Sequence, residues 1–474
     1  MSERIETDLL VIGAGSGGLS VAAGAVQMGA RVVLVEKGEM GGDCLNYGCI
    51  PSKALLAAAK SAHAAETSRS FGIDLGNAKI DFRKVHDHVH DVIAGIAPHD
   101  SQERFEGLGV TVIRAAAKFT GPREVEADGK RIRARRIVVA TGSRPRIVPI
   151  PGLEDVPYLT NETIFSLTER PEHLVVIGAG PIGLEMAQAF RRLGSRVTVL
   201  EKFHALPKDD TELARDLLER LQGEGIELRE GVDIERVERQ GDEIRVSASR
   251  EGKTDSLAGS HLLLATGRAP AVEDLDLEAA GIAYDKSGIV TDARLRTSNK
   301  RVFAIGDCRQ GLQFTHVAGY EAGIVIRNAL FKLPAKAEYS AVPWVTYTDP
   351  ELAQVGLTEQ DARDRYGDSV SVLRAEYADN DRARTERITT GCVKVIARKG
   401  RPVGATVFGA QAGELINFWT LAISQKLKLS AIAGYISPYP TLSELNKRAA
   451  GMAFTETLFS DRTRRLVRFL QKLG

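Results

Sequence analysis

The sequence is poor in cysteine, in net charge and in long apolar runs. Only four cysteines occur in 474 residues, which is too few for the disulfide framework of a secreted protein and suits a reducing compartment. Lys and Arg together number 63 against 62 Asp and Glu, a balance that argues against nucleic-acid or anionic-membrane partners. Because no apolar run reaches about 18 residues without charges, we expect no transmembrane helix and a cytoplasmic protein.

The chain is nevertheless rich in apolar residues and in glycine. Its length suggests about three domains, and an apolar content of 43% is enough for several cores. The 46 glycines gather in turns between predicted strands and helices, which is typical of α/β enzymes. The polar residues 1–8 lead directly into a strand, so we expect no signal peptide.

Two of the four cysteines, Cys44 and Cys49, lie five positions apart just before the helical pattern at 54–60. Pro51 suits the first turn of that helix, because an amide there needs no intrahelical partner. Cys49 is therefore expected near a helix N-terminus, where free amides and the helix dipole favour a thiolate. The pattern indicates a redox-active pair; a structural disulfide or part of a metal site is the alternative.

A nucleotide-binding pattern precedes the cysteines. Its predicted elements are a strand at 8–12, a glycine turn at 13–18, a helix at 19–28 and a strand at 31–35. Gly13 permits the tight turn, Gly15 lets a pyrophosphate approach the backbone, and Gly18 lets helix and strand pack closely. Glu36, at the tip of the second strand, would bind the adenosine ribose.

The same pattern recurs later in the chain. Its elements are a strand at 174–177, a turn at 178–183, a helix to 193 and a strand at 196–200. Gly178, Gly180 and Gly183 take the three glycine positions, and Glu201 lies as far from Gly178 as Glu36 lies from Gly13. Two matched copies predict two dinucleotides, a resident FAD and a mobile nicotinamide, and therefore a hydride-transfer enzyme.

Glu201 also bears on which nicotinamide is used. A carboxylate about 5 Å from a 2′-phosphate costs roughly 3 kcal/mol per unit charge at an effective dielectric of about 20. This cost favours NAD(H) over NADP(H) by around a hundredfold. Lys202 and His204 follow directly and would weaken the preference.

Further glycine turns follow predicted strands, at Thr141 and Gly142 and again at Gly267. Asp307 ends the strand at 301–305, where it could cap the strand or hold a ribityl hydroxyl. The two remaining cysteines are expected to be small buried residues: Cys308 and Cys392.

Together, these motifs resemble the class I flavoprotein disulfide reductases, the family of dihydrolipoamide dehydrogenase, glutathione reductase and mercuric reductase. The resemblance implies an α/β fold with two Rossmann-like domains and an α+β dimerisation domain. The implied boundaries are 1–150 and 272–340 for FAD, 151–271 for NAD(P)H, and 341–474 for dimerisation. It also implies a homodimer, because one subunit's C-terminal domain completes the other's active site.

The resemblance assigns roles to individual residues. Cys49 is implied to contact the flavin and Cys44 to exchange with the substrate. Lys53 is implied to place its ammonium near the flavin, with Glu185 as its partner, which fits the stabilisation of an anionic reduced ring by a fixed cation. The alternatives are a solvated lysine and a surface acid. The turn residues are implied to bind cofactors, Thr141, Gly142 and Asp307 for FAD and Gly267 for NAD.

The C-terminal part departs from the pattern of the disulfide-acting members. Tyr439 stands where they carry a histidine, and Glu444 keeps the position of the glutamate five residues later. Ionising a tyrosine at pH 7 costs roughly 4 kcal/mol, so Tyr439 is better suited to donate a hydrogen bond than to act as a base. Glu444 is either catalytic or part of a helix capping box with Thr441.

A tyrosine at this position, after a proline, resembles the pattern of mercuric reductase. Residues 468–474, however, lack the cysteine pair with which that enzyme collects its metal. The leading prediction is an FAD enzyme that passes electrons from NADH to Cys44 and Cys49 and on to a disulfide or dithiol acceptor, a small molecule or a protein. The alternatives are reduction of a soft metal ion or a quinone, and a non-enzymatic redox sensor.

A histidine cluster, of which His86 and His90 share a predicted helix face, could suggest a metal site. A third ligand of clear geometry is missing from the pattern, so a solvated helix face is expected and no metal is predicted.

Overall fold

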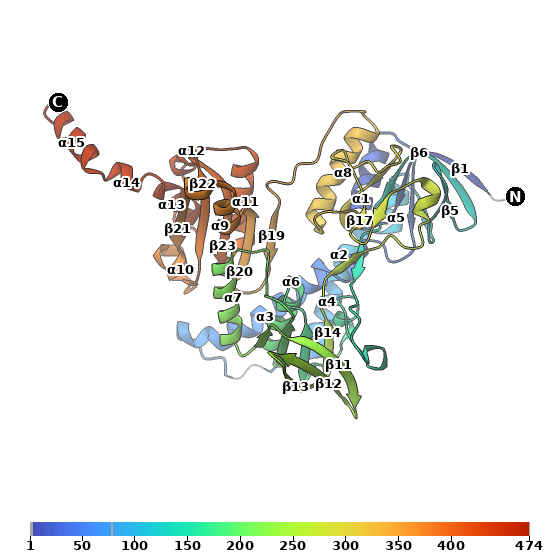
Figure 1. The fold of residues 1–474 in the computed structure, drawn as a ribbon, viewed down its shortest axis with the longest axis horizontal. Helices are drawn as coiled ribbons and strands as arrows, with labels where there is room; N and C mark the ends of the chain where they lie inside the picture. Colours follow the sequence, from blue (N-terminus) through green and yellow to red (C-terminus); the bar gives the residue numbers. More distant parts are fainter. Residues whose placement is uncertain (1–2, 77–78, 474) are drawn as a thin grey trace. The chain divides into compact units, whose positions relative to one another are not determined.

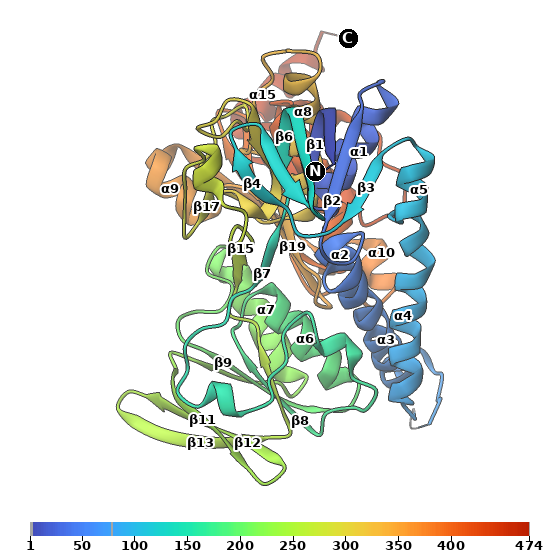
Figure 2. The same ribbon diagram turned by 90° about the vertical axis from the view of Figure 1, so that its right-hand side faces the viewer.

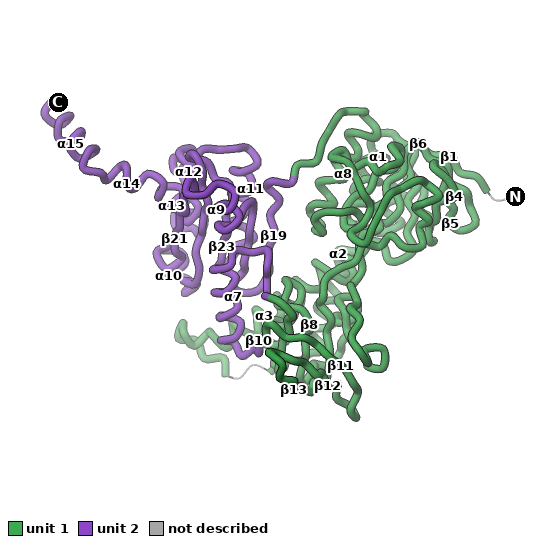
Figure 3. Tube along the Cα trace, viewed as in Figure 1, with its two compact units in different colours: residues 1–203, 228–338 green, residues 204–227, 339–474 purple. Residues whose placement is uncertain are grey.

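The computed structural model describes residues 3–76 and 79–473 (Figure 1). They form two compact units (Figure 3). Unit 1 consists of Met1–Phe203 and Leu228–Glu338, and unit 2 consists of His204–Glu227 and Tyr339–Gly474. Each unit is described separately below.

The first sheet of unit 1 has seven strands, in the order β3-β2-β1-β6-β5-β4 with β18 beside β6. Their bounds are Arg4–Ile12 (β1), Val32–Glu36 (β2), Thr111–Arg114 (β3), Lys118–Gly121 (β4), Glu124–Ala127 (β5), Lys130–Val139 (β6) and Val302–Ala304 (β18). Strands β1, β2, β3, β6 and β18 pair in parallel. The apolar run 9–12 is fully buried, as expected for a parallel strand covered on both faces.

The helices that follow strands of this sheet include those that carry Cys44 and Cys49. The helices α1 (Ser16–Gln27) and α8 (Thr315–Ala329) contact each other, and α3 (Cys49–Thr67) packs beside α4 (Phe82–Ile96) (Figure 2). The short helices α2 (Gly42–Asn46) and α5 (Gln102–Gly107) complete this part. The predicted helix at 19–28 thus begins three residues earlier, at Ser16, because the glycine turn itself enters the helix.

A second sheet has the strand order β10-β9-β8-β14, in which β8 pairs in parallel with β9 and with β14. The helix α6 (Pro181–Arg192) follows β8 in the chain. Its strands are His173–Ile177 (β8), Arg196–Glu201 (β9), Glu227–Glu230 (β10) and His261–Leu264 (β14). An antiparallel sheet joins β11 (Asp233–Gln240), β12 (Glu243–Arg250) and β13 (Lys253–Gly259). Two-stranded sheets pair β7 (Ser143–Pro145) with β15 (Arg268–Pro270), and β16 (Tyr284–Asp285) with β17 (Gly288–Ile289).

Unit 2 is built on a five-stranded antiparallel sheet in the order β19-β20-β23-β22-β21. The strands are Pro343–Thr346 (β19), Glu351–Gly356 (β20), Val370–Glu376 (β21), Cys392–Arg398 (β22) and Arg401–Gly409 (β23). The helices are Thr211–Gly223 (α7), Glu359–Tyr366 (α9), Asp381–Thr385 (α10), Ala412–Ser424 (α11), Leu429–Gly434 (α12), Glu444–Met452 (α13), Thr455–Leu458 (α14) and Asp461–Leu470 (α15). Trp419 and Tyr377 are fully buried in its core.

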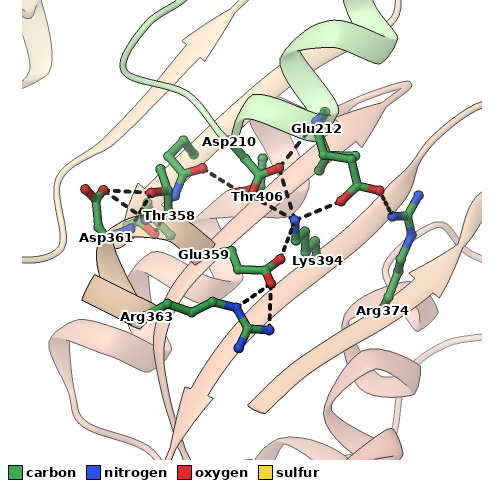
Figure 4. Close-up of polar contacts among 12 residues, drawn as sticks. Asp210, Glu212, Thr358, Glu359, Asp361, Arg363, Arg374, Lys394 and Thr406 are labelled. Carbon is green, nitrogen blue, oxygen red and sulfur yellow. Dashed lines mark hydrogen bonds and ion pairs between the residues drawn. The ribbon is translucent and has the colours of Figure 1, made fainter. Parts of the chain in front are cut away.

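A buried lysine joins α7 to this sheet (Figure 4). Lys394 of β22 contacts Asp210 at 3.0 Å, Glu212 at 2.9 Å and Glu359 at 2.8 Å. Burial opposes its charge, yet the hydrogen bonds that Lys394 donates to the three carboxylates raise its pKa. A buried ammonium requires such partners, and two of them, Asp210 and Glu212, come from the start of α7. This helix therefore packs in unit 2, although its residues lie within the range 151–271 that was predicted for the NAD(P)H domain. The boundaries of the three predicted domains stay a prediction.

The architecture confirms the predicted fold class, with two sheets built around parallel strands and an α+β unit. Among the described residues, none of the helices combines the length and the apolar character needed to span a membrane.

Candidate active site

The two cysteines of the predicted redox pair face each other as free thiols. Cys49 is exposed at the first position of α3, as predicted, and Cys44 is half-buried in α2. A hydrogen bond from the Cys44 thiol lowers the pKa of Cys49 to about 6, aided by the Thr315 hydroxyl and by Lys53, while burial and Asp43 oppose the shift. The same hydrogen bond, with burial, raises the pKa of Cys44. The pair is therefore poised as one thiolate and one thiol at neutral pH.

Lys53 and Glu185 meet as the resemblance implies. Lys53 Nζ lies 2.8 Å from Glu185 Oε2 and is its hydrogen-bond donor. Lys53 belongs to the same helix as Cys49, whereas Glu185 comes from α6, which packs against α3. The Glu185 side chain is only 5% exposed, so it is not a surface acid.

The first glycine turn has the geometry expected of a nucleotide site. Gly13 adopts φ of +103°, and a Cβ there would lie 2.4 Å from the Ala140 carbonyl oxygen. A Cβ on Gly18 would lie 1.8 Å from the Gly13 carbonyl oxygen. Within 4 Å, the one described atom that a Cβ on Gly15 would meet beyond its chain neighbours is the Gly42 Cα, at 4.0 Å. Gly13 and Gly18 are therefore required by the fold, and Gly15 leaves the backbone accessible.

Glu36 closes this turn from the tip of β2. Its carboxylate accepts hydrogen bonds from the amides of Ala14, at 2.5 Å, and Gly38, at 2.6 Å. Among the described residues, α1 has no side-chain cap and no acid in its first turn. Its N-terminal amides and dipole therefore suit a phosphate group.

The second glycine turn repeats this geometry. Gly178 adopts φ of +108°, and a Cβ on Gly183 would lie 2.0 Å from the Gly178 carbonyl oxygen. A Cβ on Gly180 would meet no described atom within 4 Å, apart from its chain neighbours. Glu201 accepts hydrogen bonds from the amides of Ala179, at 2.8 Å, and Phe203, at 2.9 Å. The geometry of this turn, like that of the first, therefore fits a dinucleotide.

An arginine that was not among the predicted site residues, Arg268, links the predicted Asp307 to the cysteine segment. Arg268 Nη2 lies 2.9 Å from Asp43 Oδ1, and Arg268 Nε donates to Ser143 Oγ at 2.7 Å. Ser143 in turn donates to Asp307 Oδ2 at 2.7 Å. Burial raises the pKa of Asp307, although the hydrogen bond from Ser143 and the positive charge of Arg268 oppose this shift. The only sequence signal was a cation directly after Gly267, since its partners are distant in the chain.

The remaining turn residues lie close to this network. The Thr141 hydroxyl donates to the Ala271 carbonyl oxygen at 2.6 Å, and the Gly142 carbonyl oxygen accepts from the Ala271 amide at 2.9 Å. Cys308 and Cys392 are fully buried, as predicted, and burial raises the pKa of both thiols.

Tyr439 and Glu444 lie in unit 2. The exposed Tyr439 hydroxyl donates to Asp381 Oδ2 at 3.0 Å, and this hydrogen bond raises the pKa of Tyr439. The predicted capping box is only half present: the Thr441 amide donates to Glu444 Oε2 at 3.5 Å, but the helix starts at Glu444 with Ser443 as its N-cap. The other half of the predicted capping box is wrong, because the Thr441 hydroxyl donates to the Pro438 carbonyl oxygen and does not cap the helix.

The histidines predicted to be solvated line one face of α4. His86 and His90 stack with ring centroids 4.0 Å apart. Within the part of the chain that the structure describes, no group of three potential ligands is arranged to hold a metal ion.

Residues 7–322 match the family described as pyridine nucleotide-disulphide oxidoreductase, and residues 342–450 match the dimerisation domain of that family. The chain belongs to this family. It is accordingly an FAD-dependent pyridine nucleotide-disulfide oxidoreductase, with FAD and a pyridine nucleotide as its cofactors.

Similar proteins within the family differ in their named activities. The chain is 36% identical over 442 residues to a mercuric reductase of Bacillus cereus, covering 92% of this chain and 70% of that protein. It is 37% identical over 449 residues to a dihydrolipoyl dehydrogenase of Thermus scotoductus, covering 92% and 95%. A solved neighbour is the Cu(II) complex of the HOCl-induced flavoprotein disulfide reductase RclA from Escherichia coli, with a TM-score of 0.84, 28% identity and coverage of 93% and 98%.

Proposed function

We propose that the enzyme oxidises NADH and reduces a disulfide acceptor through the Cys44–Cys49 pair. FAD, held at the first glycine turn, would supply the redox chemistry between NADH and the disulfide of this pair. Cleavage of that disulfide by two electrons and one proton leaves a thiol on Cys44 and a thiolate on Cys49. The observation that carries the proposal is the opposite shift of the two pKa values, downward for Cys49 and upward for Cys44.

The first glycine turn, with Glu36, Thr141, Gly142 and Asp307, is proposed to hold FAD. Gly13 and Gly18 shape that turn, and Gly15 admits the pyrophosphate. Lys53 is proposed to present its ammonium to the flavin, held by its 2.8 Å contact with Glu185. A cation fixed in this way stabilises negative charge without reorganising during the reaction.

The second glycine turn and Gly267 are proposed to bind the nicotinamide cofactor, with NAD(H) preferred. The Glu201 carboxylate already accepts two backbone amides, which holds its charge where an adenosine ribose would bind. Lys202, which could offset that charge, pairs with Asp233 at 2.5 Å. The repulsion of a 2′-phosphate by Glu201 is therefore retained.

In the acceptor half-reaction, Cys44 attacks one sulfur of the acceptor disulfide and releases the other as a thiol. Cys49 then displaces the second sulfur from Cys44 as a thiolate, which restores the Cys44–Cys49 disulfide. With one proton from solvent, the acceptor becomes a dithiol. Cys44 must first lose its proton, which the departing acceptor sulfur takes up. Asp381 raises the pKa of Tyr439, so less tyrosinate is present at neutral pH to act as the base. We propose that, in a homodimer, Tyr439 and Glu444 serve the other subunit's site, with Tyr439 as a hydrogen-bond donor and with slow disulfide turnover.

A soft metal ion is the second candidate acceptor. Two sulfur atoms in contact, one of them a thiolate at neutral pH, suit such an ion as substrate. One similar protein is named mercuric reductase, and the solved neighbour is a Cu(II) complex.

All four cysteines are free thiols, which fits the reducing, cytoplasmic location that we propose.

The test is anaerobic reduction of the FAD-loaded enzyme with NADH, followed by titration with lipoamide, glutathione disulfide, a quinone, Hg²⁺ and Cu²⁺. We expect two new thiols per subunit and a long-wavelength thiolate-to-flavin band with a midpoint near pH 6, present above it and lost below it as Cys49 is protonated. Cys49→Ser should remove the band, and Tyr439→His should raise disulfide turnover. Failure of NADH to generate thiols in the wild-type enzyme would refute the proposal.

A further inference from the structure

Three helices of unit 1 begin at the cysteine pair. Ser16 is the first residue of α1, Cys49 of α3 and Thr315 of α8. The Ser16 hydroxyl hydrogen-bonds Cys44, and Thr315 Oγ1 lies 3.4 Å from Cys49 Sγ and also reaches Cys44. Because the N-terminus is the positive end of a helix dipole, all three helix ends favour negative charge on the pair.

The Thr315 hydroxyl is not used to cap its own helix. The N-cap of α8 is Phe314, which cannot accept a hydrogen bond through its side chain, and Thr315 follows as the first helical residue. The threonine side chain is exposed. The contact of the hydroxyl with Cys49 Sγ gives it a specific partner.

The charged groups that face Cys49 are themselves paired. Lys53, which favours the thiolate, lies 2.8 Å from Glu185. Asp43, which opposes the thiolate, lies 2.9 Å from Arg268. Pairing weakens the field of each charge at the sulfur, whereas a hydrogen bond to a charged acceptor acts directly and is about twice as strong as a neutral one.

We infer that Thr315 is a positioning residue, whose hydroxyl donates a hydrogen bond to the Cys49 sulfur and thereby stabilises the thiolate of the reduced pair on that cysteine. The inference rests on the proposed function of Cys44 and Cys49. Thr315 belongs to α8, 266 positions after Cys49 in the chain, and contacts the cysteine pair from there. Thr315 contacts both thiols, whereas Lys53 acts on Cys49 and Ser16 on Cys44.

The experiment compares Thr315→Val, which keeps the shape of the side chain but removes the hydroxyl, with Thr315→Ser, which keeps the hydroxyl. Thr67→Val is the matched control, because Thr67 is an exposed threonine of α3 whose hydroxyl, among the described residues, bonds to the backbone of its own helix. The FAD-loaded, dithiol-reduced proteins are alkylated with iodoacetamide from pH 4.5 to 9. Fragmentation of the peptide that contains both cysteines then assigns the rate to each sulfur.

Thr315→Val should raise the apparent pKa of Cys49 by about one unit, which lowers its alkylation rate below pH 6 about tenfold. Thr315→Ser and Thr67→Val should keep the wild-type profile, and the long-wavelength band should shift with the alkylation profile. Thr315→Ala, as a smaller second variant, should match Thr315→Val. An unchanged profile in Thr315→Val, or an equal shift in Thr315→Ser, would overturn the inference.

The two proposals fail separately in this experiment. If NADH does not reduce the wild-type pair but Thr315→Val still shifts the pKa of Cys49, the electron path is wrong and the role of Thr315 stands. If NADH reduces the wild-type pair and Thr315→Val leaves the pKa unchanged, the electron path stands and the role of Thr315 is wrong.

Discussion

The two glycine turns of unit 1 are nearly identical in local geometry. Gly13 and Gly178 share a positive φ, of +103° and +108°. Each turn is closed by a carboxylate that accepts two amides, Glu36 in the first and Glu201 in the second. Local sequence spacing is sufficient to specify this arrangement twice, because the strand, the turn and the helix are contiguous in the chain.

The turns differ in what covers them. The cysteine segment lies against the first one: the Gly41 amide donates to the Ala14 carbonyl oxygen at 3.0 Å, and a Cβ on Gly42 would lie 2.7 Å from the Gly15 Cα. The middle glycine of the second turn, Gly180, has no such described neighbour within 4 Å. A covered turn suits a resident nucleotide beside the thiols, and an open turn suits a nucleotide that must enter and leave.

The largest expected effect tests whether the two turns require glycine equally at their third glycine position. In Gly18→Ala and Gly183→Ala, the new Cβ would lie 1.8 and 2.0 Å from a backbone carbonyl oxygen. Since backbone cannot move aside cheaply, each change should lower the free energy of unfolding by about 3 kcal/mol or more. Thermal unfolding of the FAD-free proteins measures this; a clear loss in one turn with none in the other would break the equivalence.

The next effect separates the two carboxylates. Glu201→Gln removes the charge that repels a 2′-phosphate, so the kcat/KM ratio of NADH to NADPH should fall by up to about a hundredfold. Glu36→Gln should leave that ratio unchanged and reduce the FAD retained per subunit. Steady-state kinetics and the flavin absorbance of the purified proteins report the two quantities. A wild-type preference for NADPH would contradict the assignment of Glu201.

A smaller effect assigns each turn to its nucleotide. Gly15→Ala and Gly180→Ala place a Cβ that clashes with no described atom, so both proteins should fold. The added methyl obstructs a pyrophosphate at each site. Gly15→Ala should weaken FAD binding about tenfold, and Gly180→Ala should raise the KM for NADH about tenfold with normal FAD content. The opposite pattern would exchange the two assignments.

The smallest expected effect concerns the surface of the second turn. Lys202 is largely exposed and pairs with Asp233, and such exposed pairs contribute at most about 1 kcal/mol. Lys202→Ala should therefore change the ratio of NADH to NADPH use by less than about threefold. A tenfold increase in this ratio would show that Lys202 offsets Glu201 after all.

The sequence by itself determined the local chemistry of this protein. The two glycine patterns, their closing glutamates and the position of Cys49 at a helix start all depend on residues close together in the chain. The contact between Lys53 and Glu185 followed from the family resemblance, and the structure has it at 2.8 Å. These features are predictable because turn geometry and helix ends are set by neighbouring residues.

Only the tertiary structure decided which distant residues surround the thiols. Thr315 reaches Cys49, and Arg268 reaches Asp43, across more than two hundred positions of the chain. The packing of α7 against Lys394 in unit 2 is of the same kind. No periodicity or spacing encodes such contacts, because they arise where separate helices end at one place and where a buried charge requires a partner from another element.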